Sequence, residues 1–138
     1  MNEWSLAVEP LSSDEVWEPD EIELFLFSSA LWLPHRIHYD RDFAREEGHR
    51  DLVIHGPLQV ARLLEQVSNW IRPTGGEFVS ATFRHRAPAY LGDRIRLRNE
   101  VTRTVHDEHS VDVTLNSRVV RDDGTDLTTG QVVVRIPL

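Results

Sequence analysis

The amino-acid sequence predicts an α+β fold in which an antiparallel β-sheet wraps around one long helix. Residues 56–71 have the pattern of a helix that is apolar around most of its circumference, as is typical of a helix covered by neighbouring elements. Apolar and polar residues alternate in four later segments, with the period of half-buried strands. A length of 138 residues with 40% hydrophobic side chains suits one soluble domain. We therefore expect a single domain over residues 1–138.

The chain begins with what we expect to be an irregular, acidic lead of about 20 residues. This lead contains Pro10 and Pro19, and its stretch 12–15 suits at most a capped turn. The following stretch 24–27 is apolar on both faces. It is expected to form either a buried strand or part of a loop that covers the core.

Two short elements and the long helix come next. Pro34 disfavours helix in the residue before it, which predicts an irregular or single-turn segment. Asp40 stands where it can cap a short helix, and Gly48 is placed to end that helix. The long helix should run from Gly56 to Ile71, because a proline suits its first turn and residues 73–76 contain the proline and glycines that stop it.

The rest of the chain alternates with a period of two. The predicted strands cover residues 79–86, 94–102, 111–116 and 131–136. In the first of these, the alternation places Val79, Ala81, Phe83 and His85 on one face. Turn-forming stretches at 92–93, 106–109 and 122–124 separate the strands. Consecutive strands with short connections predict an antiparallel meander that is apolar on one face.

Composition excludes several classes of function. The net charge of −8 argues against nucleic-acid or anionic-membrane partners. All 15 basic side chains are arginines, so lysine Schiff-base chemistry is excluded, and the lack of cysteine excludes thiolate chemistry and suits the cytoplasm. We expect no cofactor. No histidine pair with a carboxylate has convincing zinc-site spacing, so we also expect no metal.

Two segments carry a resemblance to a known family. The stretch 27–40, FSSALWLPHRIHYD, and the stretch 53–58, VIHGPL, resemble the paired signature blocks of hotdog-fold MaoC-like dehydratases. They are most similar to those of type 2 hydroxyacyl-thioester dehydratases and mesaconyl-CoA hydratase-like proteins. The stretches 83–88 and 124–135 match more loosely. The resemblance covers residues 20–138 and implies the hotdog fold.

The resemblance implies a hydro-lyase. Such an enzyme reversibly hydrates an enoyl thioester, or dehydrates a 3-hydroxyacyl thioester, carried on coenzyme A or acyl carrier protein. Hotdog proteins usually pair edge to edge, which implies a homodimer or higher oligomer, with a heteromer as the alternative. In related (R)-specific hydratases an aspartate precedes the catalytic histidine, and the dehydratase branch commonly has asparagine there. If His38 is that histidine, the position is Leu33 here.

Dehydration requires a base for the α-proton, an acid for the leaving hydroxyl and a donor to the enolate oxygen. We assign His38 as the base or water-orienting group, because imidazole titrates near neutrality. His35 either supplies a second proton-transfer group or orients the loop. The N–H of Gly56, at a helix start, is the candidate oxyanion donor. His55 either touches the thioester or supports this turn.

Four further residues are candidates for binding substrate. Arg36 either pairs with an acidic residue or holds a phosphate of the carrier. Asp40 is a surrogate acid or, as the alternative, only a helix cap. Arg84 and Arg86 could hold coenzyme A phosphates because guanidinium binds phosphate bidentately, although solvated strand faces are the commoner explanation for such arginines.

Two other functions remain open. Leu33 in the usual position of the acid suits a thioester-binding subunit that has no chemistry of its own and pairs with a catalytic chain. A hotdog thioesterase would need a carboxylate or nucleophile on or near the central helix. Glu65 is the only carboxylate in that helix, which makes this reading the weaker of the two.

Overall fold

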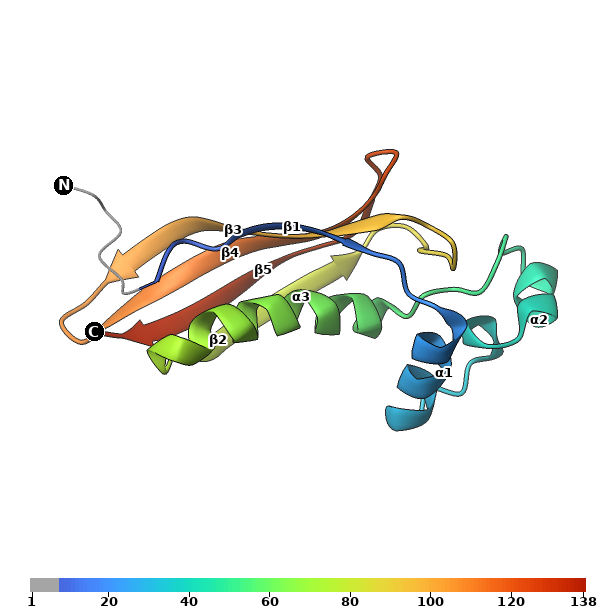
Figure 1. The fold of residues 1–138 in the computed structure, drawn as a ribbon, viewed down its shortest axis with the longest axis horizontal. Coiled ribbons are helices and arrows are strands. Elements are labelled where there is room, and N and C mark those ends of the chain that lie inside the picture. The colour runs from blue at the N-terminus through green and yellow to red at the C-terminus, as the bar shows by residue number, and fades with distance from the viewer. Residues whose placement is uncertain (1–7) are drawn as a thin grey trace.

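The computed structural model describes residues 8–138, and in this part of the chain five strands form one antiparallel sheet with a long helix against it (Figure 1). The strand order is β1-β3-β4-β5-β2. The strands are β1 (Ser12–Trp17), β2 (Glu77–His85), β3 (Ile95–His106), β4 (Ser110–Arg121) and β5 (Asp126–Pro137). The helices are α1 (Glu21–Ala30), α2 (Arg41–Glu46) and α3 (Gly56–Ile71), with 3-10 turns η1 (Arg36–His38) and η2 (Arg72–Thr74).

Helix α3 lies along one face of the sheet, and its N-terminal end points toward α1, η1 and α2 at one end of the molecule (Figure 1). Its bounds agree with the predicted ones, and the expected α+β arrangement is confirmed. Leu63, Val67 and Ile71 form a buried stripe that faces the apolar side of the sheet. The opposite side of α3 is more open than its apolar pattern suggested, since Ala61 is exposed. Within residues 8–138 no helix is long and apolar enough to cross a membrane.

The expectation of irregular chain before residue 20 is wrong for β1. This strand pairs antiparallel with β3 along its whole length. The acidic side chain of Asp14 lies 3.1 Å from the guanidinium of Arg98 and 3.3 Å from that of Arg96. The strand therefore forms because β3 offers an open sheet edge with arginines, which a local pattern cannot reveal.

The expected strand or loop at residues 24–27 is also wrong, because these residues belong to α1. Asp20 caps this helix by accepting a hydrogen bond from the backbone N–H of Glu23 at 2.8 Å. Leu24 is fully buried, whereas Phe25 and Leu26 are 58% and 59% exposed. Helix α1 therefore buries one apolar face of this stretch and leaves the other in solvent.

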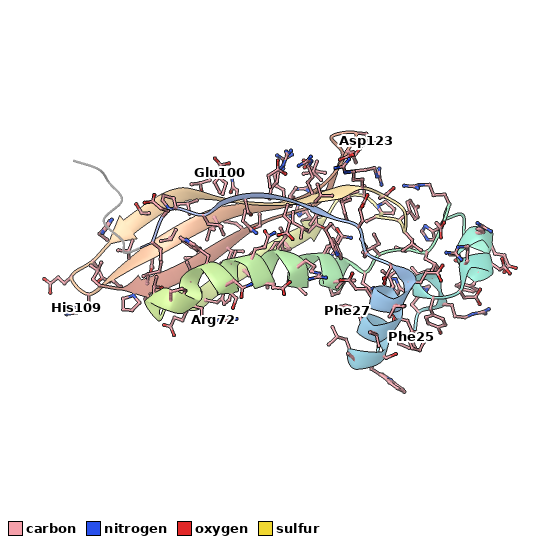
Figure 2. The ribbon with its side chains drawn as sticks, in the orientation of Figure 1. Phe25, Phe27, Arg72, Glu100, His109 and Asp123 are labelled. Carbon is pink, nitrogen blue, oxygen red and sulfur yellow. The ribbon has the colours of Figure 1, made fainter. Side chains whose placement is uncertain are left out.

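The predicted meander is correct for β3, β4 and β5 but wrong for β2. This strand pairs with β5 and forms the far edge of the sheet. The turns that carry His109 and Asp123 lie at opposite ends of the sheet, as a meander of long strands requires (Figure 2). Alternation predicts which face a side chain occupies but not which strand lies next to it, so the order of strands needed the tertiary structure.

A buried polar network fixes α3 relative to the sheet. Asn99 of β3 is fully buried and donates from Nδ2 to the carbonyl oxygen of Leu63 at 3.2 Å and to Oε1 of Gln66 at 2.8 Å. Ser117 of β4 donates to Oδ1 of Asn99. Because an unpaired polar group would be costly in this core, the network specifies one position of the helix over the sheet.

Candidate active site

The two sequence blocks that carry the resemblance meet in space at the start of α3. The backbone N–H of Val53 donates to the carbonyl oxygen of Ile37 at 2.9 Å, which joins the second block to η1. The rings of His38 and His55 stack with their centroids 3.8 Å apart. Residues that are separated in the chain therefore form one continuous site.

His38 is half-buried, and among residues 8–138 only one of its ring nitrogens makes a hydrogen bond. Its Nδ1 lies 2.7 Å from the carbonyl oxygen of Val53. A carbonyl oxygen can only accept, so Nδ1 carries the proton and Nε2 of the neutral ring holds a bare lone pair. Burial lowers the pKa of His38 below its usual value, and the bond to Val53 opposes this effect only in part. The ring is therefore neutral at pH 7 and able to accept a proton at Nε2.

His55 is 1% exposed, and its ring stacks against the ring of His38. Its Nε2 lies 2.7 Å from Oγ of Ser28, a residue of α1 that the sequence did not single out. Its Nδ1 is buried without a hydrogen-bond partner among residues 8–138. Phe27 contacts the ring edge-on at 5.0 Å. Burial on all sides favours the supporting role over direct contact with a thioester.

The buried ring of His55 predicts that the protein loses stability in mild acid. Burial, and to a lesser degree His38, lowers the pKa of His55 to about 4 from an unfolded value of 6.5. The unfolded chain therefore binds one more proton between these values, so the free energy of unfolding falls as the pH drops from 6.5 to about 4. The full loss is on the order of 3 kcal/mol. Urea denaturation at several pH values measures this loss. A His55→Gln variant should have a shallower dependence on pH, and an equal dependence would contradict the assignment.

Gly56 is the first residue of α3 and has a free backbone donor. His55 provides no side-chain cap, and within residues 8–138 the N–H of Gly56 has no acceptor. A Cβ at this position would lie 2.5 Å from Nε2 of His85 and 2.6 Å from its Cε1. Glycine is required here because the His85 ring packs against the backbone of Gly56, and not because of the backbone angles. The open N–H group and the helix dipole suit a developing negative charge.

His35 and Leu33 differ in what they offer the site. The Nδ1 of His35 accepts from the backbone N–H of Ile37 at 3.3 Å, so this exposed side chain caps η1. Its ring lies 6.1 Å from that of His38, measured between centroids. The position expected to hold an acid or amide is occupied by the partly buried, apolar Leu33. The loop thus supplies no carboxylate at this point.

Arg36 and Asp40 are engaged with each other. Nη2 of Arg36 lies 2.6 Å from Oδ2 of Asp40, and the guanidinium also lies over the ring of Phe43. Asp40 accepts from the backbone N–H of Phe43 at 3.1 Å, so the predicted helix cap is confirmed. This bond and the pairing with Arg36 hold the pKa of Asp40 below its usual value. An ionised, ion-paired carboxylate is poorly suited to donate a proton.

Arg84 and Arg86 lie at the end of β2 and just beyond it. Arg86 donates from Nε to Oγ1 of Thr129 at 3.0 Å, and Arg84 has no ion-pair partner in the part of the chain that the structure describes. Together with Arg118 they line a polar cavity of about 610 Å³ on the face of the sheet opposite α3. Such a cluster suits phosphate groups.

A second cavity, of about 420 Å³, opens beside Gly56. Its lining includes Val53 and Gly56 of the site, His49, and His85 and Arg86 from the end of β2. The sequence did not single out His85 as a site residue. The signal was present, because alternation along the strand placed His85 on the apolar face with Phe83, where a titratable side chain is unusual.

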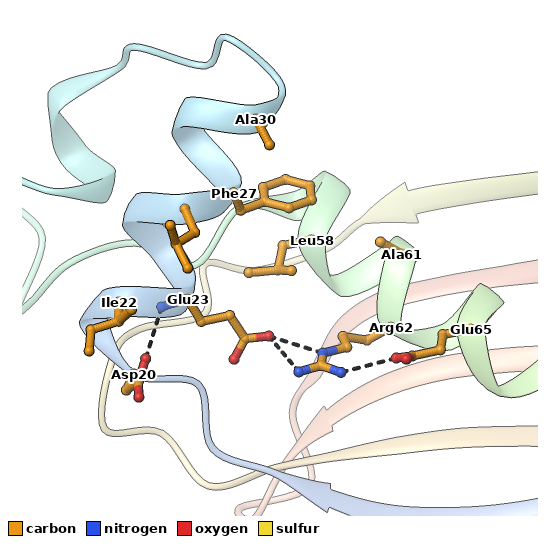
Figure 3. A pocket seen from close by; sticks show the side chains of 10 residues that line it. Asp20, Ile22, Glu23, Phe27, Ala30, Leu58, Ala61, Arg62 and Glu65 are labelled. Carbon is orange, nitrogen blue, oxygen red and sulfur yellow. Dashed lines mark hydrogen bonds and ion pairs between the residues drawn. The ribbon is translucent and has the colours of Figure 1, made fainter.

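A third cavity, of about 640 Å³, lies between α1 and α3 (Figure 3). Phe27, Leu58 and Ala61 make its wall apolar. At one end Arg62 bridges Glu23 at 2.7 Å and Glu65 at 3.0 Å. This third cavity shares no lining residue with the cavity beside Gly56. Glu65, the carboxylate that a thioesterase would need, is thus ion-paired and apart from the candidate site.

Residues 5–91 match the family model described as hydroxyacyl-thioester dehydratase type 2. The chain is 42% identical over 73 residues to mesaconyl-C(4)-CoA hydratase of Chloroflexus aurantiacus, a match that spans 52% of this chain and 25% of that protein. It is 29% identical over 85 residues to the mitochondrial 3-hydroxyacyl-[acyl-carrier-protein] dehydratase of Arabidopsis thaliana, spanning 62% of this chain and 49% of that one. The matches therefore span less than half the length of these relatives.

Solved structures share the fold over most of this chain. The (R)-hydratase of A. caviae involved in PHA biosynthesis has a TM-score of 0.84 at 22% identity, covering 96% of this chain and 98% of that one. The ChsH1–ChsH2 complex of Mycobacterium tuberculosis has a TM-score of 0.79 at 21% identity, covering 95% and 99%. These neighbours confirm the hotdog fold. With the family model matching more than half of its residues, the chain belongs to the type 2 hydroxyacyl-thioester dehydratase family.

Proposed function

We propose that this chain is a hydro-lyase that hydrates an enoyl thioester and, in reverse, dehydrates a 3-hydroxyacyl thioester. The observation that carries the proposal is the bare Nε2 of His38, whose ring stacks on that of His55, the residue directly before Gly56 and its free N–H. A base and an oxyanion donor are what α-proton removal next to a thioester carbonyl requires. The curated relatives, a hydratase and a dehydratase of thioesters, support the same reaction.

In the dehydration direction, Nε2 of His38 takes the proton from C2 of the acyl group. The electron pair moves toward the thioester oxygen, where the N–H of Gly56 stabilises the enolate. The C3–O bond then breaks, and the hydroxyl leaves as water with a proton from a second acid, while His38 keeps the C2 proton until it passes to solvent. Hydration follows the same steps in reverse. Arg84 and Arg86 are proposed to hold phosphates of the carrier, and the cytoplasm is the proposed site of action.

The direct test is turnover by the purified chain alone. Crotonyl-CoA and 3-hydroxybutyryl-CoA are the first substrates, followed by a panel of longer, branched and dicarboxylic enoyl thioesters on coenzyme A and on acyl carrier protein. Loss of the enoyl absorbance, with formation of the 3-hydroxyacyl product, is the expected result. No turnover across the whole panel would contradict the proposal.

Leu33 favours a second function, a thioester-binding subunit that works beside a catalytic chain. The related fold in the ChsH1–ChsH2 complex is that of an assembly of two different chains. Under this alternative, the chain binds a thioester without converting it and gains activity only when a second chain is added. Turnover by the chain alone excludes it.

We also propose that two copies pair through β2. In the part of the chain that the structure describes, β2 pairs only with β5, and it carries the exposed apolar side chain of Phe78. A β-bulge between Phe78 and Ser80 brings Ala81, which is also exposed, to the same face of the strand. Light scattering should report twice the 15.9 kDa of one chain, and an Ala81→Asp variant should be monomeric because like charges would face each other across the pair. A monomeric parent protein would contradict this pairing.

A further inference from the structure

His85 lies against Gly56, although the two residues come from different elements. The three atoms nearest to a Cβ built at position 56 all belong to the His85 ring, and the nearest is Nε2 at 2.5 Å. Both residues line the cavity that opens beside Val53. The edge of the His85 ring that carries Nε2 is therefore at the free N–H end of α3, where the thioester is proposed to bind.

Hydrogen bonds determine which nitrogen of His85 carries the proton. Gln59 is buried and donates from Nε2 to the carbonyl oxygen of Ile54 at 3.4 Å, which leaves its Oε1 as an acceptor. The hydroxyl of Thr128, also buried, donates to that Oε1 at 2.8 Å. The Thr128 oxygen must then accept from Nδ1 of His85, 2.9 Å away. In the neutral ring Nδ1 is protonated and Nε2 is bare.

The site thus has two histidines with the same arrangement. His38 uses Nδ1 on the carbonyl oxygen of Val53 and His85 uses Nδ1 on Thr128, so each presents Nε2 as its reactive nitrogen. His38 approaches the 53–56 segment from η1, and His85 approaches it from β2. Leu33 provides no acid, and Asp40 is ion-paired. We propose that His85 is the second proton-transfer group of the thioester site, an inference that rests on the proposed function.

The proton balance requires one neutral and one protonated histidine. In dehydration, neutral His38 removes the C2 proton, and His85, protonated at Nε2, gives that proton to the leaving hydroxyl as the C3–O bond breaks. The products are an enoyl thioester, water, protonated His38 and neutral His85. In hydration, the water oxygen bonds to C3 while His85 takes a proton from that water, and His38 returns a proton to C2. His85 is exposed, so it can exchange protons with solvent between turnovers.

Two other charged or titratable side chains line the same cavity. Arg86 is bonded to the Thr129 hydroxyl, and Nδ1 of His49 lies 3.0 Å from the hydroxyl of Tyr90. Neither supplies any of the atoms nearest to a Cβ at Gly56. His85 combines a bare nitrogen, a buried hydrogen-bond chain that holds its ring, and contact with the oxyanion donor.

The test compares His85→Gln and His85→Ala with the parent protein on an enoyl-CoA that the parent hydrates. Glutamine retains an amide hydrogen-bond donor but transfers no proton. Both variants should lower kcat by about 10²-fold with little change in KM, and the limb of the pH–rate profile that reports the second histidine should disappear. Added imidazole should restore part of the activity of His85→Ala, which a purely structural role would not produce. His109→Ala, in a distant turn, is the matched control and should behave as the parent.

The outcomes separate this inference from the proposed function. If the parent is active, His38→Ala is inactive and His85→Gln equals the parent, the hydro-lyase stands and the role of His85 is wrong. If the parent converts no thioester, both fail. Nitrogen-15 NMR of the histidine rings provides a readout without substrate. The neutral His85 ring should be protonated at Nδ1, Thr128→Val should change that tautomer, and a ring protonated at Nε2 in the parent would overturn the inference.

Discussion

Replacement of His38 by alanine is expected to lower kcat by about 10²- to 10⁴-fold, the range associated with loss of a general base. The expectation depends on the bond between Nδ1 and the Val53 carbonyl, which leaves Nε2 as the only group on this ring able to take the C2 proton. Steady-state kinetics on the best thioester of the panel measure the effect. The loss should appear in kcat and in kcat/KM together, because the interaction is made in the transition state.

A matched variant separates chemistry from folding. His38→Asn places an amide donor near the position of Nδ1 and can keep the bond to Val53, while it lacks Nε2. Both variants should show the same large loss of kcat, but the asparagine variant should unfold closer to the parent in urea. An active His38→Asn variant would contradict the role of Nε2. His106→Ala, at the exposed end of β3, should leave both activity and stability unchanged.

Gly56→Ala should be the second most damaging change to activity. Its Cβ would lie 2.5 Å from Nε2 of His85, a distance that requires the ring or the start of α3 to move. Displacement of the ring breaks its bond to Thr128, and movement of the helix end misplaces the oxyanion donor. We expect kcat/KM to fall by about 10²-fold or more, and stability to fall by about 1–3 kcal/mol from overpacking. Kinetics and urea denaturation of the same variant give the two numbers.

A double variant identifies why Gly56→Ala loses stability. In a His85→Ala background the steric conflict is removed, so Gly56→Ala should then cost little stability. The two single losses of stability should therefore not add, as is usual for residues in contact. Additive losses would show that the clash with His85 is not the reason for glycine at this position.

Several features could be predicted from sequence because their causes are local. The bounds of α3 follow from a proline in its first turn and a proline–glycine stop. Asp40 is a cap because its carboxylate reaches an N–H group only three residues away. Strand alternation assigned Phe83 and His85 to the inner face, where the structure has them pointing toward α3 and Gly56.

Other features depend on groups that are distant in the chain. β1 forms because β3 presents an open edge with Arg96 and Arg98, and α1 buries Leu24 against residues that come later. The acidic, proline-containing lead gave no periodic signal for the strand. The stretch 24–27 was misjudged because apolar residues on both faces do not distinguish strand from helix.

The sequence by itself determined the fold class, the central helix and the family of this chain, because short-range patterns and two motif blocks carry that information. The tertiary structure alone decided which ring nitrogens keep a bare lone pair. Nδ1 of His38 is hydrogen-bonded to the carbonyl oxygen of Val53, and Nδ1 of His85 is hydrogen-bonded to the hydroxyl of Thr128 in β5. The tautomer is set by hydrogen-bond partners, and these partners come from segments that are distant in the chain and meet only in the folded protein.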